Sequence, residues 1–578
     1  MSKLAPASPA QQAVAPSLLF GLMLVLAVTC APLIAFSQTP SSTLYNQLAA
    51  VFGWGWVLWL GARQVRGLQL DGGSAALALL LAAPFVSAVW NGLPLSLALE
   101  SGTLLLAALL VYLAGSGLRE ELRVDAFTWL CWGLLLAGLL SFIVSLAQVF
   151  MPDWTNGWLI ARSGLPGRAI GNMRQPNHLA SLMMWASVAA VYLGDQGRLG
   201  RWSAAALPLL LFGFVFTIVL SASRTGMGSV ALLVIWGAID NSLKRSARIA
   251  LVCTALMVGL SWWGMEQWAH AGHVFGAQTR LETEGAGSKS RLAILANAWE
   301  LVKSNPWTGV GWGEFNLAWT MTPFPGRPVA FFDHTHDLLM QLAVELGLPL
   351  AALITGLLLW ALWRALDAGI QAAGPEVVMR RSAVMVVLTI GVHSLLEYPL
   401  WYAYFLLPCA YAMGLAAPRG RAVGAAWTPG LLEILGAVLI AGSLYAVWDY
   451  SRVVAIYAPP EHAQSLADRI KAGQQSSFFS AQADYAAATS LPDNPLALDA
   501  AKRTAHNLID VRLMIDWAEA LHAAGDDERA RYVAARLREF HYPQGDEWLV
   551  PCKLLAGDAD RPFQCDPPKR EFSWREMR

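Results

Sequence analysis

The chain has 578 residues, of which 56% are hydrophobic and 14% are charged, whereas ordinary soluble domains carry roughly 25% charged residues. Because so little charge cannot cover several globular domains, the composition predicts an all-α polytopic membrane protein. Forty Lys and Arg residues balance forty Asp and Glu residues, which leaves no net positive field to hold a polyanion and excludes nucleic-acid binding as the main function.

Long apolar runs recur from residue 18 to residue 448. A membrane-spanning helix needs about 20 mostly apolar residues, and about 13 runs approach that length. The first run is longer than a signal-peptide core and is soon followed by another span, so we expect it to be retained. The predicted spans lie near residues 18–36, 44–62, 75–91, 94–114, 126–150, 178–194, 204–221, 226–240, 248–265, 337–363, 382–396, 398–417 and 430–448.

The short loops divide sharply by charge, and cytoplasmic loops are the ones enriched in Lys and Arg. If residues 1–17 form a cytoplasmic N-terminus, every inner loop is basic, whereas the short outer connections 37–43 and 91–94 contain no Lys or Arg. The pattern predicts an odd number of spans and an exported C-terminal tail; losing one span near 221–226 would invert everything after it. The inner-loop residues are Arg63, Arg66, Arg119, Arg123, Arg198, Arg201, Lys244, Arg245, Arg248, Arg364, Arg380, Arg381, Arg419 and Arg421.

Two predicted outer loops are long, 151–177 and 266–336. Within the second, segment 288–304 has apolar residues at helical spacing. We expect an amphipathic helix that lies on the bilayer surface or caps a cavity, and we therefore look for function on this face. The apolar residues of the segment are Leu292, Leu295, Ala296, Trp299 and Val302.

Polar clusters at the outer ends of the spans are candidates for function, because ionisable groups at membrane depth are costly. Residues 174–178 read Arg-Gln-Pro-Asn-His; proline suits the first turn of a helix, but a helix start needs fewer polar groups than these. In the next cluster, 221–226, Arg224 stands among small hydroxylic residues. An arginine there suits a phosphate, although it could also extend to the interface.

The second outer loop contributes two further clusters. Ser290 and Arg291 precede a glycine-rich stretch at 305–315, which permits a tight turn but lacks the Gly-Lys-Ser/Thr ending of a phosphate loop. Residues 333–337 read Asp-His-Thr-His-Asp, and such a histidine can accept a proton while a carboxylate orients its ring. The alternatives are a metal site, for which no third ligand has suitable spacing, and a helix cap at Asp337.

The last cluster, 393–402, reads His-Ser-Leu-Leu-Glu-Tyr-Pro-Leu-Trp-Tyr and lies between two spans. It brings Glu397, Tyr398 and Tyr402 to the same face of the membrane as the other four clusters. That convergence is the strongest indication of a functional site.

Charge density rises from residue 449, which predicts a soluble domain over 449–578. Segment 515–540 is typical of two helices around the turn at Ala524, Gly525 and Asp526. Such a pair is the unit of tetratricopeptide-like arrays, but a plain helical bundle fits equally well. If the tail is exported, Cys552 and Cys565 enter an oxidising compartment and can form a disulfide; two unpaired thiols are the alternative.

These five clusters resemble those of the O-antigen ligase and polymerase superfamily, and most of all those of the bacterial PglL-type protein O-oligosaccharyltransferases. The resemblance covers roughly residues 15–450. It implies a GT-C-like bundle in the bacterial inner membrane, with a catalytic domain over 18–448, a periplasmic loop over 266–336 and a periplasmic helical domain over 449–578. The implied reaction moves a glycan from undecaprenyl pyrophosphate to a hydroxyl of an exported protein such as a pilin, with no metal or other cofactor.

The resemblance also implies roles for individual residues. His336 matches the general base, with His334 as its rival, and Arg224 and Arg291 match the arginines that bind the pyrophosphate. Asp337 stands where many relatives have Asn, which leaves open whether it tunes the base. The remaining candidates are Gln175, Tyr402, His178 and Arg174 on the donor side, and Asp337, Glu397 and Tyr398 as acceptor or supporting residues.

Other functions fit parts of the pattern. An O-antigen ligase acting on lipid A core, or an O-antigen polymerase, would share the donor and the chemistry and differ in the acceptor. A transporter of the lipid-linked sugar would be expected to show an internal repeat or matched broken helices, and we find neither. A membrane scaffold would leave five polar clusters unexplained. The expected partners are the lipid-linked glycan, an acceptor protein or lipid A core, and membrane lipid.

Overall fold

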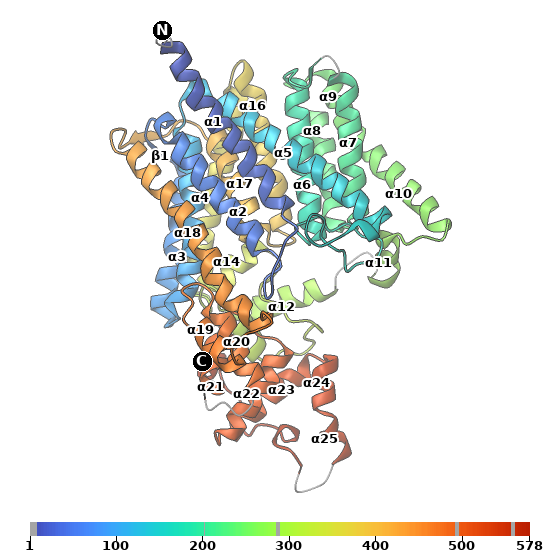
Figure 1. The fold of residues 1–578 in the computed structure, drawn as a ribbon, viewed down its shortest axis with the longest axis vertical. Coiled ribbons are helices and arrows are strands. Elements are labelled where there is room, and N and C mark those ends of the chain that lie inside the picture. Colours follow the sequence, from blue (N-terminus) through green and yellow to red (C-terminus); the bar gives the residue numbers. More distant parts are fainter. Residues whose placement is uncertain (1–8, 201–202, 285–288, 492–495, 556–560) are drawn as a thin grey trace.

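The computed structural model describes residues 9–200, 203–284, 289–491, 496–555 and 561–578. It shows a bundle of long helices with a second helical body at one end, while the first described helix begins at the opposite end of the bundle (Figure 1). Residues 1–8 of the predicted N-terminal segment, Arg201 and Ser288 lie outside the described residues.

The bundle is built from apolar segments whose backbone groups are satisfied within each helix, as the hydrocarbon region of a membrane requires. Its helices are α1 (Pro9–Cys30), α2 (Leu44–Gly61), α3 (Gly72–Asn91), α4 (Leu95–Gly117), α5 (Glu120–Phe150), α6 (Pro176–Asp195), α7 (Ser203–Leu220), α8 (Arg224–Ile239), α9 (Arg245–Val252), α10 (Thr254–His270), α15 (Leu348–Gln371), α16 (Pro375–Ser394), α17 (Ala403–Ala416) and α18 (Thr428–Tyr457). A short antiparallel ladder of β1 (Leu68–Leu70) and β2 (Arg421–Val423) joins two loops.

Each predicted span contains helix. Within the described residues, seven helical segments are long and apolar enough to cross a membrane, and four shorter apolar helices accompany them. The chain is therefore a largely helical membrane protein, and a total of thirteen spans stays a prediction. The predicted span 337–363 is two helices, because Gly347 adopts φ +78° between α14 (Leu338–Leu346) and α15 and a Cβ there would lie 2.4 Å from the carbonyl oxygen of Trp307.

Two of the predicted inner-loop arginines are buried at the end of α17. Arg123 donates to the carbonyls of Gly414, Leu415 and Ala417 at 2.7 to 3.1 Å, and Arg380 donates to those of Ala416 and Ala417 at 2.9 Å. The last carbonyls of a helix have no partner within it and carry partial negative charge. These two arginines therefore terminate α17.

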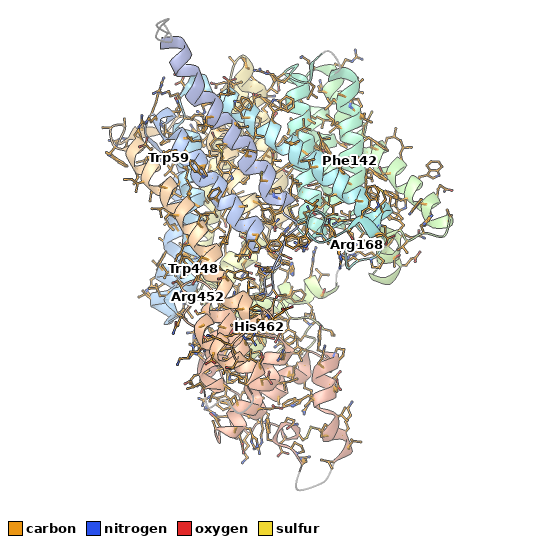
Figure 2. The ribbon with its side chains drawn as sticks, viewed as in Figure 1. Trp59, Phe142, Arg168, Trp448, Arg452 and His462 are labelled. Atoms are coloured by element: carbon orange, nitrogen blue, oxygen red, sulfur yellow. A yellow bond between two sulfur atoms is a disulfide. The ribbon has the colours of Figure 1, made fainter. Side chains whose placement is uncertain are left out.

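Exposed tryptophans lie toward both ends of the bundle. Trp59 lies on α2, and Trp448 lies on α18 where that helix approaches the second body (Figure 2). They are 43% and 54% exposed, and the guanidinium of Arg452 lies 4.6 Å from the centre of the Trp448 ring. Tryptophan is enriched at membrane–water interfaces, so both positions fit the edges of a bilayer.

The second body combines the tail with part of loop 266–336. The loop contains α11 (Gly276–Glu284), α12 (Lys289–Ser304) and α13 (Phe315–Met321), and α14 follows the loop directly. The tail contains α19 (Leu466–Gly473), α20 (Ser480–Ser490), α21 (Ala497–Ala505), α22 (Val511–Ala523), α23 (Asp527–Glu539), α24 (Pro543–Trp548) and α25 (Val550–Leu554). The predicted helical pair in the tail is confirmed as α22 and α23, which pack closely, as do α20 and α21.

Loop and tail share one hydrophobic core, to which α12, α13, α14 and tail helices α19 to α23 contribute. Arg327 of the loop, fully buried, pairs with Glu539 at 3.2 Å, and the Tyr532 hydroxyl donates to the carbonyl of Met321 at 2.7 Å. Helix α18 continues through residue 449 to Tyr457. The tail is thus joined to the bundle by a helix and to the loop by a core.

Helix α12 is present where the amphipathic helix was predicted, and the apolar residues named for it divide between exposed and buried positions. Leu292 and Trp299 are 72% and 46% exposed. Its buried face carries Ile294, Ala298, Leu301 and Val302. The helix is apolar on two sides, and periodicity could not tell which of them packs on the tail.

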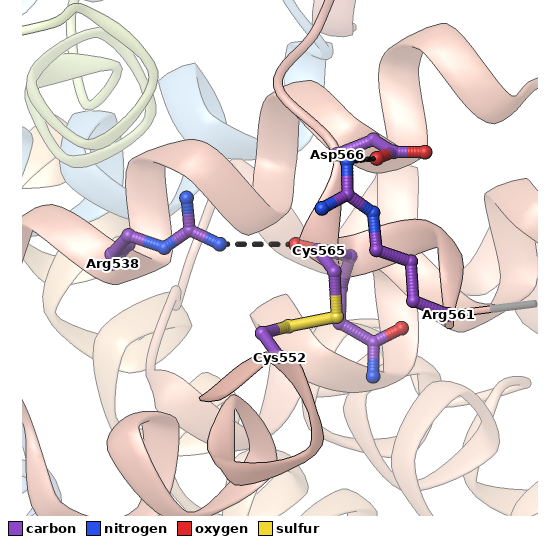
Figure 3. Close-up of a disulfide and its surroundings, with 6 residues drawn as sticks. Arg538, Cys552, Arg561, Cys565 and Asp566 are labelled. Carbon is purple, nitrogen blue, oxygen red and sulfur yellow. Dashed lines mark hydrogen bonds and ion pairs between the residues drawn. A yellow bond between two sulfur atoms is a disulfide. The ribbon is translucent and has the colours of Figure 1, made fainter. Parts of the chain in front are cut away.

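Cys552 and Cys565 form a disulfide (Figure 3), which confirms the predicted pairing. Beside it Arg561 pairs with Asp566, and Arg538 donates to the carbonyl of Gln564 at 3.1 Å. The bond ties α25 to the segment that follows it.

Removing this crosslink should weaken the tail. Closing a loop of this size contributes about 3 kcal/mol by restricting the unfolded chain. We therefore expect Cys552→Ser to lower the free energy of unfolding of the tail by about 3 kcal/mol, measured by thermal unfolding in detergent. Cys565→Ser should match it and the double variant should be no worse. An unchanged midpoint would show that the bond does not form in the purified protein.

Candidate active site

All five sequence clusters meet in one hydrogen-bonded network around Glu397. This carboxylate lies between α16 and α17 and is 5% exposed. It accepts from Asn177 Nδ2 at 2.8 Å and from His336 Nδ1 at 2.9 Å, and it pairs with Arg291 of α12. The hydroxyl of Ser223 donates to Asn177 Oδ1 at 2.6 Å, which adds the fifth cluster. Residues separated by as many as 220 positions are thereby joined.

The network keeps Glu397 ionised. Burial alone would raise the pKa of this carboxyl, but its interactions with His336 and Arg291 outweigh burial and lower the pKa below its ordinary value. An ionised carboxylate can only accept hydrogen bonds. His336 must therefore donate from Nδ1, which makes Nε2 the nitrogen that can take up a proton.

The carboxylate that orients His336 is Glu397, not its neighbour Asp337. Asp337 Oδ1 accepts the backbone N–H of Met340 at 2.8 Å and so caps α14, as the alternative interpretation of the sequence allowed. The N–H of Thr335 donates to Gln341 Oε1 at 2.8 Å. The backbone on both sides of His336 is thus fixed by α14.

His334, the rival base, lies beside the network without joining it. Its ring centre is 5.0 Å from that of His336, and its Nδ1 contacts Asp333 at 2.6 Å. Burial lowers the pKa of His334 despite the opposing effect of Asp333. Its ring packs on Tyr398, and it makes no hydrogen bond to Glu397 among the described contacts.

The remaining donor-side candidates surround the start of α6. Gln175 Oε1 accepts the N–H of Asn177 at 2.8 Å and caps the helix. His178 Nδ1 lies 2.9 Å from the Tyr404 hydroxyl, and its ring centre lies 4.4 Å from that of Tyr402. Gln175 therefore fixes the backbone of Asn177, while the rings of His178 and Tyr402 pack against each other beside the network.

The side chain of Arg174 is held by hydrogen bonds to backbone carbonyls. Its guanidinium donates to the carbonyls of Ala35, Ser42 and Asn172, which ties the α1–α2 connection to the start of α6. We expect Arg174→Ala to lower the free energy of unfolding by about 1 to 3 kcal/mol, because the half-buried contacts to the carbonyls of Ala35 and Asn172 lose their donor. The KM for the donor implied by the sequence resemblance should change little. A large rise in that KM with unchanged stability would instead assign Arg174 to donor binding.

Strained backbone concentrates at this site. Four described non-glycine residues have positive φ, and three of them belong to the clusters: Arg174 at +56°, Ala222 at +54° and His336 at +57°. Such conformations are uncommon for residues with a Cβ and persist only where surrounding contacts hold them. Here the contacts are those of the network and of the helix starts beside it.

Arg224 begins α8 directly after a network residue. Ser223 caps that helix by accepting the N–H of Gly226 at 2.9 Å while donating to Asn177. The chain of contacts from His336 through Glu397 and Asn177 to Ser223 places the two ends of the site on the same side of the bundle. The predicted proximity of His336 and Arg224 is consistent with that chain.

Sequence reasoning assigned no role to Asn177 or Ser223, although both lie in the clusters it singled out. The sequence marked them only as members of polar runs, because each makes its hydrogen bond to a residue far away in the chain. His393 belongs with them: Ser181 lies 2.5 Å from its Nδ1, and its carbonyl accepts the N–H of Glu397 at 2.9 Å.

No set of three or more His, Cys, Asp and Glu side chains within the described ranges is arranged to hold a metal ion. The two histidines of the 333–337 cluster each contact a carboxylate instead. Independence from metal stays a prediction.

Three families match parts of the chain. Residues 169–193 match a protein glycosylation ligase, residues 208–355 match O-antigen ligase, and residues 382–551 match the C-terminal part of a virulence factor membrane-bound polymerase. Every predicted site residue falls within one of these regions, and the resemblance inferred from the clusters is confirmed.

Two curated relatives come from Acinetobacter baylyi. A general O-oligosaccharyltransferase is 29% identical over 341 residues, 55% of this chain and 56% of the relative. A ComP-specific O-oligosaccharyltransferase is 22% identical over 314 residues, 52% of this chain and 53% of the relative. The chain thus spans about half the length of the curated relatives it matches.

Proposed function

From a chain that contains O-antigen ligase and protein glycosylation ligase regions, we propose an enzyme that transfers an undecaprenyl-pyrophosphate-linked glycan to Ser or Thr hydroxyls of exported proteins such as pilins. The observation that carries the proposal is the single network in which an oriented imidazole, an ionised carboxylate and an arginine meet. The two O-oligosaccharyltransferase relatives support the same reaction class.

In the proposed reaction His336 Nε2 accepts the proton of the acceptor hydroxyl as its oxygen attacks the anomeric carbon. The bond from that carbon to the pyrophosphate oxygen breaks, and undecaprenyl pyrophosphate leaves with the bonding electron pair. Glu397 stabilises the imidazolium that forms, and Arg224 and Arg291 neutralise charge on the departing phosphate. Arg291 already lies beside Glu397, so the donor's phosphate would compete with that carboxylate for it.

The proposed location is the bacterial inner membrane, with the site and the tail in the periplasm. The tail disulfide supports an oxidising compartment for that end of the chain. The buried arginines Arg123 and Arg380 lie at the other end of the bundle, and the basic loops predicted there fit the cytoplasmic side.

A second candidate shares the donor and differs in the acceptor. The match of residues 382–551 to a membrane-bound polymerase favours extension of the glycan itself, and the O-antigen ligase match favours transfer to lipid A core. The test is to incubate purified protein in detergent with a labelled lipid-linked glycan and three acceptors: an exported protein, lipopolysaccharide, and unlabelled lipid-linked glycan.

We expect label on the exported protein. Label on lipopolysaccharide, or on longer lipid-linked chains, would instead assign ligase or polymerase activity. Absence of transfer to every acceptor, together with movement of the lipid-linked glycan across vesicle membranes, would replace the proposal with a transport function.

A further inference from the structure

A row of aromatic rings connects the tail to His336. We call the rings of Phe540, Trp319, Phe332 and His336 the aromatic chain. Their successive centres are 5.5, 5.9 and 5.2 Å apart, and each pair meets edge to face. These distances lie within the range in which aromatic pairs attract each other. Only Phe540 comes from the tail; the other three belong to loop 266–336.

The tail end of the aromatic chain is firmly held. Phe540 and Trp319 are fully buried, and Phe331 stacks on Phe540 with ring centres 4.0 Å apart. The guanidinium of Arg327 lies 4.6 Å from the Phe540 ring and 4.8 Å from the Trp319 ring while pairing with Glu539. A displacement of Phe540 would therefore be passed to the loop and not absorbed by free space.

At the other end of the aromatic chain the His336 ring has three aromatic neighbours, with centres 5.0 Å (His334), 5.2 Å (Phe332) and 5.4 Å (Tyr398) away, and Phe332 is the one that continues to the tail. Glu397 fixes Nδ1 of His336, and the backbone there has positive φ, so the ring plane depends on what packs against its face. Phe332 meets the ring at 90°. A displacement of about 1 Å in a catalytic group can cost about 100-fold in rate.

We propose that the tail positions the imidazole of His336 through the aromatic chain, so that Phe540, Trp319 and Phe332 are positioning residues for the base. The inference rests on the proposed function and gives the tail a role in the chemical step. The competing role, gripping the acceptor protein, would require a surface of the tail instead of its buried contact with the loop.

The test replaces Phe540 with leucine, which keeps the site apolar and removes the ring. The matched control is Phe563→Leu, because Phe563 also lies in the tail but packs on Trp548 and His522. We expect Phe540→Leu to lower kcat about tenfold, with little change in the KM for donor or acceptor. Phe563→Leu should leave both constants unchanged. A rise in the acceptor KM alone would overturn the proposal in favour of acceptor binding.

A second measurement does not depend on glycan transfer. The rate at which diethyl pyrocarbonate modifies His336, mapped by mass spectrometry, should rise about threefold or more in Phe540→Leu, because the ring is less restrained. The exposed His462 on the α18–α19 connection (Figure 2) serves as the internal reference. An unchanged ratio of the two rates would overturn the proposal.

If Phe540→Leu fails to fold, Phe332→Leu in the loop carries the same two expectations, and wild-type values for it would overturn the proposal. A wild-type protein without transferase activity would refute the proposed function, whereas an active wild type with an unaffected Phe540→Leu variant would refute only the role of the aromatic chain.

Discussion

Replacing His336 with alanine is expected to lower glycan transfer by about 10²- to 10⁴-fold, the usual contribution of a general base. His336 is the only histidine among the described residues whose ring donates to Glu397. We therefore expect no other histidine to replace it as the group that accepts the proton of the acceptor hydroxyl. The measurement is the initial rate of transfer by detergent-purified protein. The variant should insert and purify like the wild type, because the side chain is partly exposed and fills no core position.

His334→Ala is the control for that prediction. His334 contacts Asp333 and Tyr398 but lies outside the network, so its loss should cost less than the loss of His336. If His334→Ala were the inactive variant and His336→Ala retained wild-type rates, the roles of the two histidines would be exchanged. Equal, small losses would remove both from proton transfer.

Replacing Glu397 with glutamine should lower the rate by about 10³- to 10⁴-fold, as happens when an amide replaces the carboxylate behind a catalytic histidine. The amide cannot stabilise the imidazolium, and the ion pair between Arg291 and residue 397 is lost. The same substitution at Glu433, which pairs with Arg63 away from the network, should leave the rate unchanged. A Glu397→Gln variant with near-normal kcat would reduce Glu397 to a packing role.

The lowered pKa of Glu397 adds a pH dependence to this prediction. A carboxyl with a lowered pKa in the folded state stabilises the protein above its ordinary pKa, and that stability is lost as the pH falls through the lowered value. We therefore expect the wild type to unfold at a higher temperature than Glu397→Gln near neutral pH. The difference between the two unfolding temperatures should disappear only at pH values below the ordinary carboxyl range. A difference that disappears near neutrality would contradict the ionised assignment.

Much of the bundle could be predicted from the sequence, because a membrane limits the backbone to helices of set length. The five clusters were also identified, since polar groups stand out in apolar surroundings. The junctions were harder. The predicted span 337–363 divides at Gly347, where a single glycine in an apolar run gave no sign of which backbone would approach it.

Pairings across the fold could not be predicted. The sequence placed an aspartate beside His336, but Asp337 caps a helix and the orienting carboxylate arrives from Glu397, 61 positions later. The shared core of loop and tail was missed for a related reason. Helix α12 has two apolar faces, and only the presence of α13, α14 and the tail decides that Ile294 and Val302 are covered while Leu292 is not.

The arginines that close α17 also constrain how this protein could have changed its orientation over time. A topology is ordinarily reversible by exchanging a few charged residues between connecting segments. Here replacing Arg123 or Arg380 would also leave carbonyl oxygens at the end of α17 without a hydrogen-bond donor. If these arginines also set the orientation predicted from the sequence, a change of orientation would first require another way to end that helix.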